Sequence, residues 1–444
     1  MRLAEVGRCR VGLLGFGREG QAAAAVLQAA WPNIDLTVLA ESGPPPAGFE
    51  ARIGRFDDRL QDFDLLLRSP GVPVLHPALQ RFRAAGGRVV NPASIWFAER
   101  PDVPVIGVTG SKGKSTTVSM LAHVLRAAGR RVLLAGNIGV PLLAHLETDA
   151  ELVVLELSSY QLADLEGRLD LGLMTRLFPE HGDWHGGVTH YYASKLRMIE
   201  LLHGAPLLIN ACDPVLLAET AAAPNRLLGN RAPLVHRQGD ALYRGENKLL
   251  ELEQLALIGR HNLDNAALAL EAARLKGVPL ERAVSALRDF QPLQNRLEQL
   301  EDRCGLRWIN DSIATTPHAT LAALQALSGQ SVVLIAGGYV RPADWAPVLE
   351  HCRRHPLQGL VLLPDSGPSV AAAFEQAGVA PLQPPCLVAG LPEAVAEAAR
   401  LADGQGTVLL SPGAASFPQF RDFEDRGRCF RTAVSDYYKD RSTA

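Results

Sequence analysis

The sequence feature that most constrains the fold is a glycine-rich loop between an apolar run and a helix-like segment. Residues 103–108 are apolar and predict a buried strand, and residues 109–115 read Thr-Gly-Ser-Lys-Gly-Lys-Ser. Residues 116–128 have helix periodicity and precede Gly129, which is typical of a helix C-terminus. A strand, a glycine-rich turn and a helix in this order are typical of parallel α/β sheets that bind phosphate at the helix N-terminus.

Lysine and hydroxyl side chains in this loop predict binding of a nucleoside triphosphate with Mg²⁺. Lys114 can neutralise β- and γ-phosphate oxygens, and the Ser115 hydroxyl can bind the metal. The spacing departs from the usual phosphate loop, because Val108 stands where its first glycine would be. A glycine-rich surface turn is the alternative, which the flanking strand and helix disfavour. The residues predicted to surround the phosphates are Gly110, Ser111, Lys112, Gly113, Lys114, Ser115 and Thr116.

Short apolar runs alternate with helix-like segments along most of the chain, which predicts an α/β fold with parallel sheets. The length of 444 residues suits three domains, which we place at residues 1–93, 94–295 and 296–444. The predicted strands are residues 9–14, 36–40 and 65–67 in the first domain, 103–108, 132–134, 152–157, 171–177 and 207–210 in the second, and 307–310, 332–335, 359–363 and 407–410 in the third.

Composition argues against several classes of protein. Lys and Arg number 44 against 47 Asp and Glu, a net charge of −3 that argues against a nucleic-acid-binding or membrane-surface protein. No apolar stretch approaches the about 18 residues needed to span a bilayer, and the N-terminal residues lack the pattern of a signal peptide. Six cysteines without a CxxC pair predict reduced thiols and hence a cytoplasmic enzyme.

A second glycine loop, GFGREG at residues 15–20, follows the first predicted strand and precedes a helix predicted at residues 21–30. This GxGxxG pattern brings a helix N-terminus close to a diphosphate. Glu41 follows about 20 residues on, as an acidic residue does in dinucleotide-binding folds. Three interpretations stay open: a nucleotide diphosphate other than NAD, NAD itself, and a tight turn without a ligand.

Residues at other strand ends are candidates for metal binding. Glu156 ends a buried strand and His181 follows another, at the edge where parallel sheets bind ligands. Mg²⁺ at Ser115 needs further ligands, although either residue could instead be a solvated loop residue. Lysine usage adds Lys195, because only six of the 44 basic residues are lysine and two of those lie in the phosphate loop. Chance placement of these lysines is the alternative.

Together these motifs resemble the Mur ligase family, and within it the MurD type, which adds glutamate to UDP-N-acetylmuramoyl-L-alanine. The likeness covers nearly the whole chain. It rests on residues 109–116, GNIG at 136–139, ELSSYQ at 156–161, GRHNLDNA at 259–266, NRLE at 295–298, NDS at 310–312 and QFRDFEDRG at 419–427. The resemblance implies a Rossmann-like first domain for the UDP-sugar, a central ATPase-like domain with a parallel or mixed sheet, and a Rossmann-like third domain for glutamate.

The resemblance also implies the chemistry. ATP converts the alanine carboxylate into an acyl phosphate, the amine of glutamate attacks it, and ADP and phosphate are released, in peptidoglycan-precursor synthesis. The implied catalytic residues are Lys114, Glu156, His181 and Lys195, and the implied metal ligands are Ser115, Glu156, His181 and Lys195. Lys195 would be carbamylated, which turns an ammonium into a carboxylate-like ligand, and two Mg²⁺ sites are expected. Small molecules are the only partners expected, for a chain that acts as a monomer.

Further binding residues follow from the same resemblance. Nucleotide contacts beyond the phosphate loop are expected at Asn137, Asn262, Asn265, Arg296 and Asp311. The UDP-sugar is expected to contact Gly15, Phe16, Gly17, Ser69 and Gly71, with other substrate contacts at Ser158, Ser159 and Gln161. Glutamate is expected to contact Thr315, Arg341, Ser416 and Phe423.

Three positions of the third domain depart from the usual glutamate-adding pattern. Ile313 and Arg341 each stand where a lysine is usual, and Phe417 stands where a leucine is usual. Together with GFGREG at residues 15–20, they resemble the variant ligases that add L-glutamate, whose product a separate enzyme epimerises. The alternatives are the same ligation with D-glutamate, a nicotinamide-dependent oxidoreductase that uses the first glycine loop, and a non-catalytic nucleotide-binding module.

Overall fold

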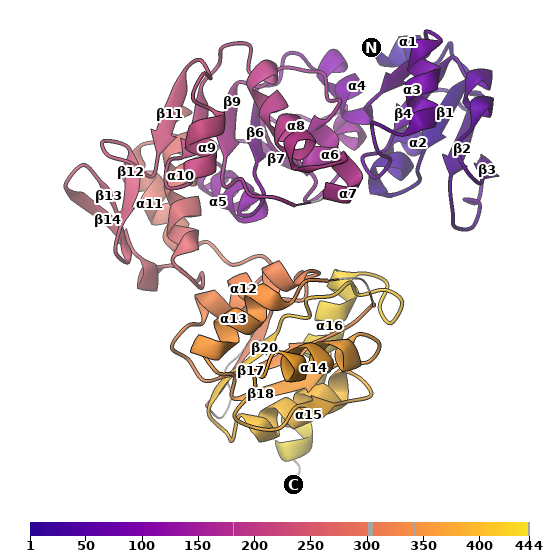
Figure 1. The fold of residues 1–444 in the computed structure, drawn as a ribbon. Coiled ribbons are helices and arrows are strands. Elements are labelled where there is room, and N and C mark those ends of the chain that lie inside the picture. The colour runs from indigo at the N-terminus through magenta and orange to yellow at the C-terminus, as the bar shows by residue number, and fades with distance from the viewer. Residues whose placement is uncertain (181, 301–304, 341–342, 443–444) are drawn as a thin grey trace. The chain divides into compact units, whose positions relative to one another are not determined.

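The computed structural model describes residues 1–444 apart from residues 181, 301–304, 341–342 and 443–444 (Figure 1). The chain forms two compact units. The first comprises Met1–Leu255 and Leu263–Phe290, and the second comprises Ala256–Asn262 and Gln291–Ala444. Both units contain mostly parallel sheets with helices between successive strands, which confirms the predicted α/β class. The domain boundaries drawn after residues 93 and 295 stay a prediction.

The first sheet of unit 1 is parallel throughout, with the strand order β3-β2-β1-β4-β5. Its strands are β1 (Val11–Leu14), β2 (Leu36–Ala40), β3 (Glu50–Ile53), β4 (Leu65–Arg68) and β5 (Arg88–Val90). The helices of this part are α1 (Leu3–Val6), α2 (Arg18–Ala30), α3 (Pro77–Ala84), α4 (Pro92–Glu99) and a 3-10 helix at Asp58–Asp62. The central strands β1 and β4 are buried along their whole length, as their apolar runs predict.

The glycine loop after β1 brings α2 close to the sheet. Gly15 has a φ of 79°, a conformation that favours glycine. A Cβ at Gly20 would overlap the carbonyl oxygen of Gly15, so the first turn of α2 packs directly on the loop. Gly15 and Gly20 are therefore required by the geometry of this turn, whereas a Cβ at Gly17 would meet nothing within 4 Å.

One hydrophobic core runs from this first sheet into the central sheet of unit 1. Trp96 of α4 is fully buried in it, and its indole Nε1 donates to the carbonyl oxygen of His145 at 3.0 Å. His145 ends the 3-10 helix Leu142–His145, which belongs to the central part of the chain. This shared core explains why the first two predicted domains form a single compact unit.

The central sheet is parallel, with the strand order β11-β10-β9-β6-β8-β7. Its strands are β6 (Val105–Thr109), β7 (Val132–Gly136), β8 (Leu152–Glu156), β9 (Leu171–Met174), β10 (Leu207–Asn210) and β11 (Arg226–Gly229). The helices are α5 (Lys114–Ala127), α6 (Ser159–Leu162), α7 (Gly182–His185), α8 (Val188–Leu201), α9 (Pro214–Glu219), α10 (His261–Leu275) and α11 (Leu280–Arg288). Because β6 lies between β8 and β9, the residues after all three strands meet at one edge of the sheet.

A three-stranded antiparallel sheet in unit 1 is not among the sequence predictions. It consists of β12 (Val235–Gln238), β13 (Ala241–Arg244) and β14 (Asn247–Glu251), and the 3-10 helix Leu252–Gln254 follows it. These strands are short and carry few apolar residues, so they lack the buried runs from which the other strands are predicted.

Unit 2 contains a six-stranded sheet with the order β15-β16-β20-β17-β18-β19; Figure 1 labels its strands β17, β18 and β20. It is parallel except for the pairing of β15 with β16. The strands are β15 (Glu298–Gln299), β16 (Leu306–Asn310), β17 (Val332–Ala336), β18 (Gly359–Leu362), β19 (Cys386–Leu387) and β20 (Gly406–Leu410). The helices are α12 (Pro317–Ala326), α13 (Ala346–Arg354), α14 (Gly367–Gln376), α15 (Leu391–Leu401) and α16 (Phe423–Ser442).

Each strand predicted from a buried apolar run is present, with small shifts at its ends. The edge strands β3, β5, β11, β15 and β19 were not predicted, because they are short or partly exposed. No helix within the described residues is both long and apolar enough to cross a membrane. The five cysteines that the structure describes are all free, and Cys304 lies outside the described residues.

Candidate functional site

The glycine-rich loop joins β6 to α5, and two of its glycines are required by its surroundings. Gly113 has a φ of 91°, and a Cβ there would lie 2.5 Å from Oδ1 of Asn265 in α10. Gly110 has a φ of 149°, and a Cβ there would overlap Oγ1 of Thr175. The loop is therefore held between α10 and the residues after β9. Because α5 begins at Lys114, the N–H groups of its first turn can bind phosphate.

Two lysine amines converge on one carbonyl oxygen of this loop. Nζ of Lys195, on α8, donates to the carbonyl of Gly110 at 2.8 Å, and Nζ of Lys114 donates to the same oxygen at 2.9 Å. Lys195 is only 2% exposed. Burial, and next the charge of Lys114, hold the pKa of Lys195 well below its ordinary value. The structure thus brings two predicted catalytic residues together and favours the neutral amine of Lys195.

Glu156, the last residue of β8, has a buried carboxylate, and only one of its two oxygens has a hydrogen-bond partner among the described residues. Its Oε1 accepts a hydrogen bond from Nδ2 of Asn137 at 2.7 Å, whereas its Oε2 has no hydrogen-bond partner among the described residues. An unpaired buried carboxylate oxygen is costly, and a bound cation removes that cost. Glu156 therefore fits the predicted Mg²⁺ site, which would also use the Ser115 hydroxyl in the first turn of α5.

The remaining predicted metal ligand, His181, lies outside the described residues. Within the described part of the chain, no three His, Cys, Asp or Glu side chains form a group that could hold a metal ion. The predicted site differs from such a group, because it also uses a serine hydroxyl and a modified lysine. The described candidates for holding Mg²⁺ are therefore Ser115, Glu156 and a carbamylated Lys195.

Two side chains of the loop already have partners within unit 1. Nζ of Lys112 forms an ion pair with Oε1 of Glu180 at 3.0 Å. The Ser111 hydroxyl bonds to the backbone of Phe178 and lies 2.8 Å from the Tyr191 hydroxyl. These contacts fix the loop and occupy the side chains of Lys112 and Ser111. Thr116 is also buried, in the first turn of α5.

The first glycine loop lines a cavity of about 610 Å³ in unit 1. Four of the five residues predicted to contact the UDP-sugar line it: Gly15, Phe16, Gly17 and Gly71. The fifth, Ser69, lies beneath the loop, where its hydroxyl donates to the carbonyl of Gly15 at 2.9 Å. Glu41 also lines the cavity. The structure thus brings the predicted UDP-sugar residues to one place.

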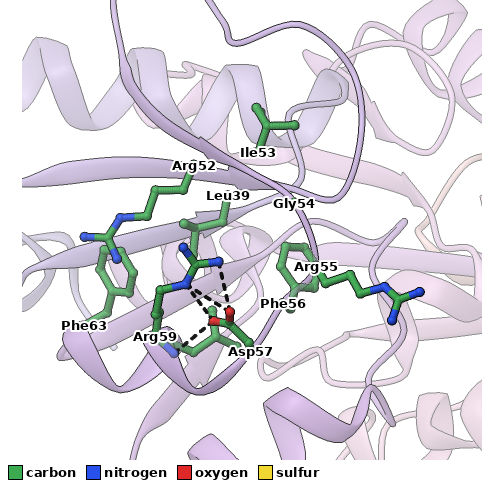
Figure 2. Close-up of a pocket in the computed structure, with 10 residues that line it drawn as sticks. Leu39, Arg52, Ile53, Gly54, Arg55, Phe56, Asp57, Arg59 and Phe63 are labelled. Atoms are coloured by element: carbon green, nitrogen blue, oxygen red, sulfur yellow. Dashed lines mark hydrogen bonds and ion pairs between the residues drawn. The ribbon is translucent and has the colours of Figure 1, made fainter.

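A second cavity, of about 20 Å³, shares Phe56 with the first and is lined in part by residues of β3 (Figure 2). Arg59 and Asp57 form an ion pair at its edge, and Leu39 and Phe63 also line it. Its volume holds about one water molecule, so it is too small for a substrate.

The predicted substrate residues after β8 lie at the start of the short helix α6. Ser158 and Gln161 form a capping box, in which each side chain bonds to the backbone of the other residue. Nε2 of Gln161 also donates to Oε1 of Glu19, in the first glycine loop, at 2.7 Å. Burial raises the pKa of Glu19, whose Oε2 has no hydrogen-bond partner among the described residues. Ser159 is buried, with its hydroxyl 2.9 Å from Nε2 of His185.

A fully buried arginine of β4 connects the first sheet to residues in and after α6. The Arg68 guanidinium forms a bidentate ion pair with Asp164, at 2.5 and 2.6 Å. It also donates to the carbonyl oxygens of Val72 and Tyr160. Nδ2 of Asn91 reaches the same carboxylate at 3.1 Å. Sequence reasoning missed this pair, because no motif signals two partners so far apart in the chain.

Of the five further residues predicted to contact the nucleotide, two belong to unit 1 and three to unit 2. In unit 1, Asn137 donates a hydrogen bond to Glu156, and the side chain of Asn265 lies beside Gly113. In unit 2, Asp311 follows β16 and accepts hydrogen bonds from the backbone N–H of Leu297 and the Ser411 hydroxyl.

The remaining two residues of that set, Asn262 and Arg296, both precede Leu297 in the chain. Nδ2 of Asn262 donates to the carbonyl of Ile258 at 2.9 Å. Arg296 directly precedes Leu297, the residue whose N–H reaches Asp311, and is partly buried.

Among the residues predicted to bind glutamate, Thr315 and Ser416 lie on two loops of unit 2 to which a buried arginine donates hydrogen bonds. Thr315 is exposed, Ser416 is 8% exposed and Phe423 begins α16, whereas Arg341 lies outside the described residues. The fully buried Arg426 of α16 donates to the carbonyl oxygens of two loop residues, at 3.0 and 2.7 Å. The two acceptor carbonyls belong to Ala414 and Ser312. Burial lowers the pKa of Arg426 to about 10.

Comparison with known proteins gives the family. Residues 108–273 match the Mur ligase middle domain, and residues 295–414 match the Mur ligase, glutamate ligase domain. The chain is 38% identical to the UDP-N-acetylmuramoyl-L-alanine--L-glutamate ligase of Xylella fastidiosa (strain Temecula1), over 97% of this chain and 96% of that protein. The chain belongs to the Mur ligase family. It is therefore an ATP-dependent amide-bond ligase, as the resemblance predicted.

Other Mur ligases extend the likeness. A UDP-N-acetylmuramoyl-L-alanine--L-glutamate ligase of Micromonospora sp. is 38% identical, over 98% of each chain. Among solved structures, the UDP-N-acetylmuramate-alanine ligase MurC of Thermotoga maritima covers 97% of this chain with a TM-score of 0.62 and 18% identity, and all of that chain is matched. An Acinetobacter baumannii ligase that adds D-alanyl-D-alanine, by its description, covers 96% of this chain and 90% of its own, with a TM-score of 0.60 and 18% identity. These structures confirm the three-domain Mur ligase fold.

Proposed function

We propose that this Mur ligase adds L-glutamate to UDP-N-acetylmuramoyl-L-alanine and releases ADP and phosphate, a step of peptidoglycan-precursor synthesis. The observation that carries the proposal is the full-length identity of 38% to proteins named for this reaction. Membership of a ligase family favours it over the nicotinamide oxidoreductase and the non-catalytic module. The same ligation with D-glutamate is the remaining alternative.

The first glycine loop is proposed to bind the UDP-sugar. Its cavity of about 610 Å³ is large enough for a nucleotide-sized ligand. Gly15 and Gly17 leave room for a diphosphate, and the N-terminus of the 13-residue helix α2 favours its negative charge. The cavity supports a nucleotide diphosphate without requiring that it be NAD.

The chemistry is proposed to pass through an acyl phosphate, because a carboxylate is a poor acyl donor. A carboxylate oxygen of the alanyl group attacks the γ-phosphorus of ATP, and the bond to ADP breaks. The glutamate amine then attacks the acyl carbon and loses a proton, and the C–O bond to phosphate breaks. Lys114 in the loop would stabilise charge that moves onto the transferred phosphoryl group. Mg²⁺ would supply further charge neutralisation when bound.

Lys195 is proposed to act as a carbamate. Its amine is buried 2.8 Å from the carbonyl of Gly110, where a protonated lysine is poorly solvated. Attack of the neutral amine on CO₂, with loss of a proton, would form an N–C bond and give an anionic ligand. Together with Glu156 and Ser115, this ligand would complete an oxygen-rich set suited to Mg²⁺. Two metal sites and participation of His181 are part of the same proposal.

The glutamate pocket is proposed to lie at the unit 2 loops that carry Thr315 and Ser416 and at Phe423, the first residue of α16. Glutamate brings two carboxylates, which need charge-assisted donors. Arg341 would supply a bidentate fork that the usual lysine cannot offer, while Ile313 removes another amine. This changed donor set is proposed to select L-glutamate.

Phosphate release tests the proposed function. Purified chain, ATP and Mg²⁺ are incubated with UDP-N-acetylmuramoyl-L-alanine and either glutamate enantiomer, and omission of the muramoyl substrate is the control. We expect release that requires both organic substrates and is faster with L-glutamate. Faster turnover of D-glutamate would replace the stereochemical assignment with the D-glutamate ligation, and no release with either enantiomer would contradict the proposed substrates.

A further inference from the structure

Arg176, two residues after β9, is fixed to the phosphate loop by its backbone. The N–H of Ser111 donates to the carbonyl of Arg176 at 2.6 Å. A Cβ at Gly110 would lie 3.0 Å from both the backbone nitrogen and the carbonyl oxygen of Arg176. The Cα of this arginine therefore keeps a constant position beside the loop, although neither the motifs nor the site described above use its side chain.

The side chain of Arg176 is held by a carboxylate from a distant part of unit 1. Its Nη2 lies 3.1 Å from Oδ2 of Asp264, which is 2% exposed, while the arginine side chain itself is 44% exposed. The guanidinium makes no other hydrogen bond to a described residue. An arginine offers five N–H donors in a fixed plane, so most of them stay available to a ligand.

A second arginine shares the same carboxylate and leaves an excess of positive charge. Nε of Arg237, on β12, lies 2.8 Å from Oδ1 of Asp264. Two guanidinium groups thus face one buried carboxylate. The charge of Lys112 in the nearby loop is by contrast balanced by Glu180. The cluster of Arg176, Asp264 and Arg237 therefore suits an additional anionic group.

Asp264 also connects the cluster to the far end of the loop. It directly precedes Asn265 in α10, and Oδ1 of Asn265 is the atom that a Cβ at Gly113 would approach to 2.5 Å. The backbone of Arg176 touches Gly110 and its side chain reaches Asp264, so the arginine extends along the loop from one end toward the other.

We propose that Arg176 is a nucleotide-binding residue that donates hydrogen bonds to the phosphate chain of ATP, and that Asp264 is a positioning residue that aims its guanidinium. The proposal rests on the ATP-dependent activity of the family and not on which glutamate enantiomer is used. A purely structural alternative is that the ion pairs only attach α10 to the central sheet and to β12.

The chain offers a matched control for that alternative. Arg176→Gln and Arg237→Gln each remove one guanidinium from Asp264, but only Arg176 has its backbone bonded to the phosphate loop. Calorimetric titration of the full chain with Mg-ADP, without muramoyl substrate or glutamate, reports nucleotide binding alone. We expect Arg176→Gln to raise the Kd at least about tenfold, and Arg237→Gln to raise it less than about threefold, with similar losses of Tm.

Arg176→Lys serves if the glutamine variant fails to fold, because it keeps the charge and loses the planar fork. We expect an intermediate rise in the Kd for Mg-ADP. Equal effects of Arg176→Gln and Arg237→Gln, or an unchanged Kd in Arg176→Lys, would overturn the role of Arg176. If the wild-type chain did not bind Mg-ADP, both this role and the proposed function would fail. If it bound Mg-ADP normally without ligating glutamate, only the proposed substrates would be contradicted.

Discussion

At the scale of single residues, the phosphate loop places two lysines at one carbonyl oxygen, and the two are proposed to have different roles. Lys114 begins α5 and is half-buried, whereas Lys195 is buried on α8. Burial holds the pKa of Lys195 well below its ordinary value. We therefore expect Lys114 to remain a charged phosphate ligand and Lys195 to be modified.

Removing the Lys114 ammonium should abolish phosphate release while UDP-sugar binding stays near wild type. Alanine has no ammonium group, so the Lys114→Ala variant lacks the positive charge that Lys114 places at the phosphate loop. Turnover should fall at least tenfold, about 1.4 kcal/mol of activation free energy. Lys248→Ala is the control, because Lys248 is an exposed lysine on β14 and should leave turnover unchanged. A smaller fall in Lys114→Ala, or an equal fall in Lys248→Ala, would argue against the phosphate role.

Lys195→Ala should be nearly inactive, because a metal would lose an anionic ligand. Acetate at high concentration should restore part of the activity by supplying a carboxylate to the vacated space. Steady-state phosphate release, measured with and without acetate, checks both expectations. An active Lys195→Arg variant, combined with an unmodified amine at neutral pH in a crystal structure, would rule out the carbamate.

Glu19 should make stability depend on pH. Burial raises its pKa, so the folded chain holds this proton at pH values where the unfolded chain has lost it. The free energy of unfolding therefore falls as pH rises from the ordinary carboxyl value through the raised one. Glu19→Gln keeps an acceptor for Gln161 and removes this loss. Its Tm should exceed that of wild type at about pH 8, and the difference should vanish near pH 4. A lower Tm for the variant at about pH 8 would mean that the ionised carboxylate is stabilising.

At the scale of secondary-structure elements, the sequence predicts interior strands well and edge strands poorly. β6, β8 and β10 are apolar over four or five residues because they are buried on both faces, and this pattern is visible without a structure. β12 and β3 each have a partly exposed face and no such run. Their place in a sheet depends on neighbouring strands that pattern alone does not reveal.

Sequence patterns likewise do not predict most contacts between these elements. The loop motif leads to Lys114 directly, and the position of Glu156 at a strand end follows from its buried run. The partner of Glu19 and the partner of Arg176 are, by contrast, 142 and 88 residues away in the chain. Such pairs form only when the sheets are assembled, so sequence spacing gives no signal for them.

The ion pair between β4 and the residues after α6 should be a major source of stability for unit 1. Asp164→Asn leaves the fully buried Arg68 without its carboxylate, which typically costs about 3 to 5 kcal/mol. The midpoint of urea denaturation should fall accordingly. Asp64→Asn is the matched control, because it breaks an exposed pair with Arg10 and should leave the midpoint nearly unchanged. Equal midpoints for the two variants would show that the buried pair contributes no more than a surface pair.

In the molecule as a whole, the residues predicted to bind the different substrates are distributed over the two units. The predicted UDP-sugar residues and the phosphate loop belong to Met1–Leu255, whereas the predicted glutamate residues belong to the unit that contains Gln291–Ala444. The α/β class was predictable because every unit repeats strand and helix. Metal occupancy, the modification of Lys195 and the choice of enantiomer depend on atoms and small distances that composition and periodicity do not encode.

We propose that this Mur ligase uses ATP to activate the alanine carboxylate of its substrate. Isotope transfer tests it most directly, with UDP-N-acetylmuramoyl-L-alanine labelled by ¹⁸O in that carboxylate, unlabelled ATP and L-glutamate. We expect each phosphate released to carry one ¹⁸O atom, because the carboxylate oxygen that attacks the γ-phosphorus leaves with it. Phosphate without ¹⁸O, released together with the ligated product, would contradict the account.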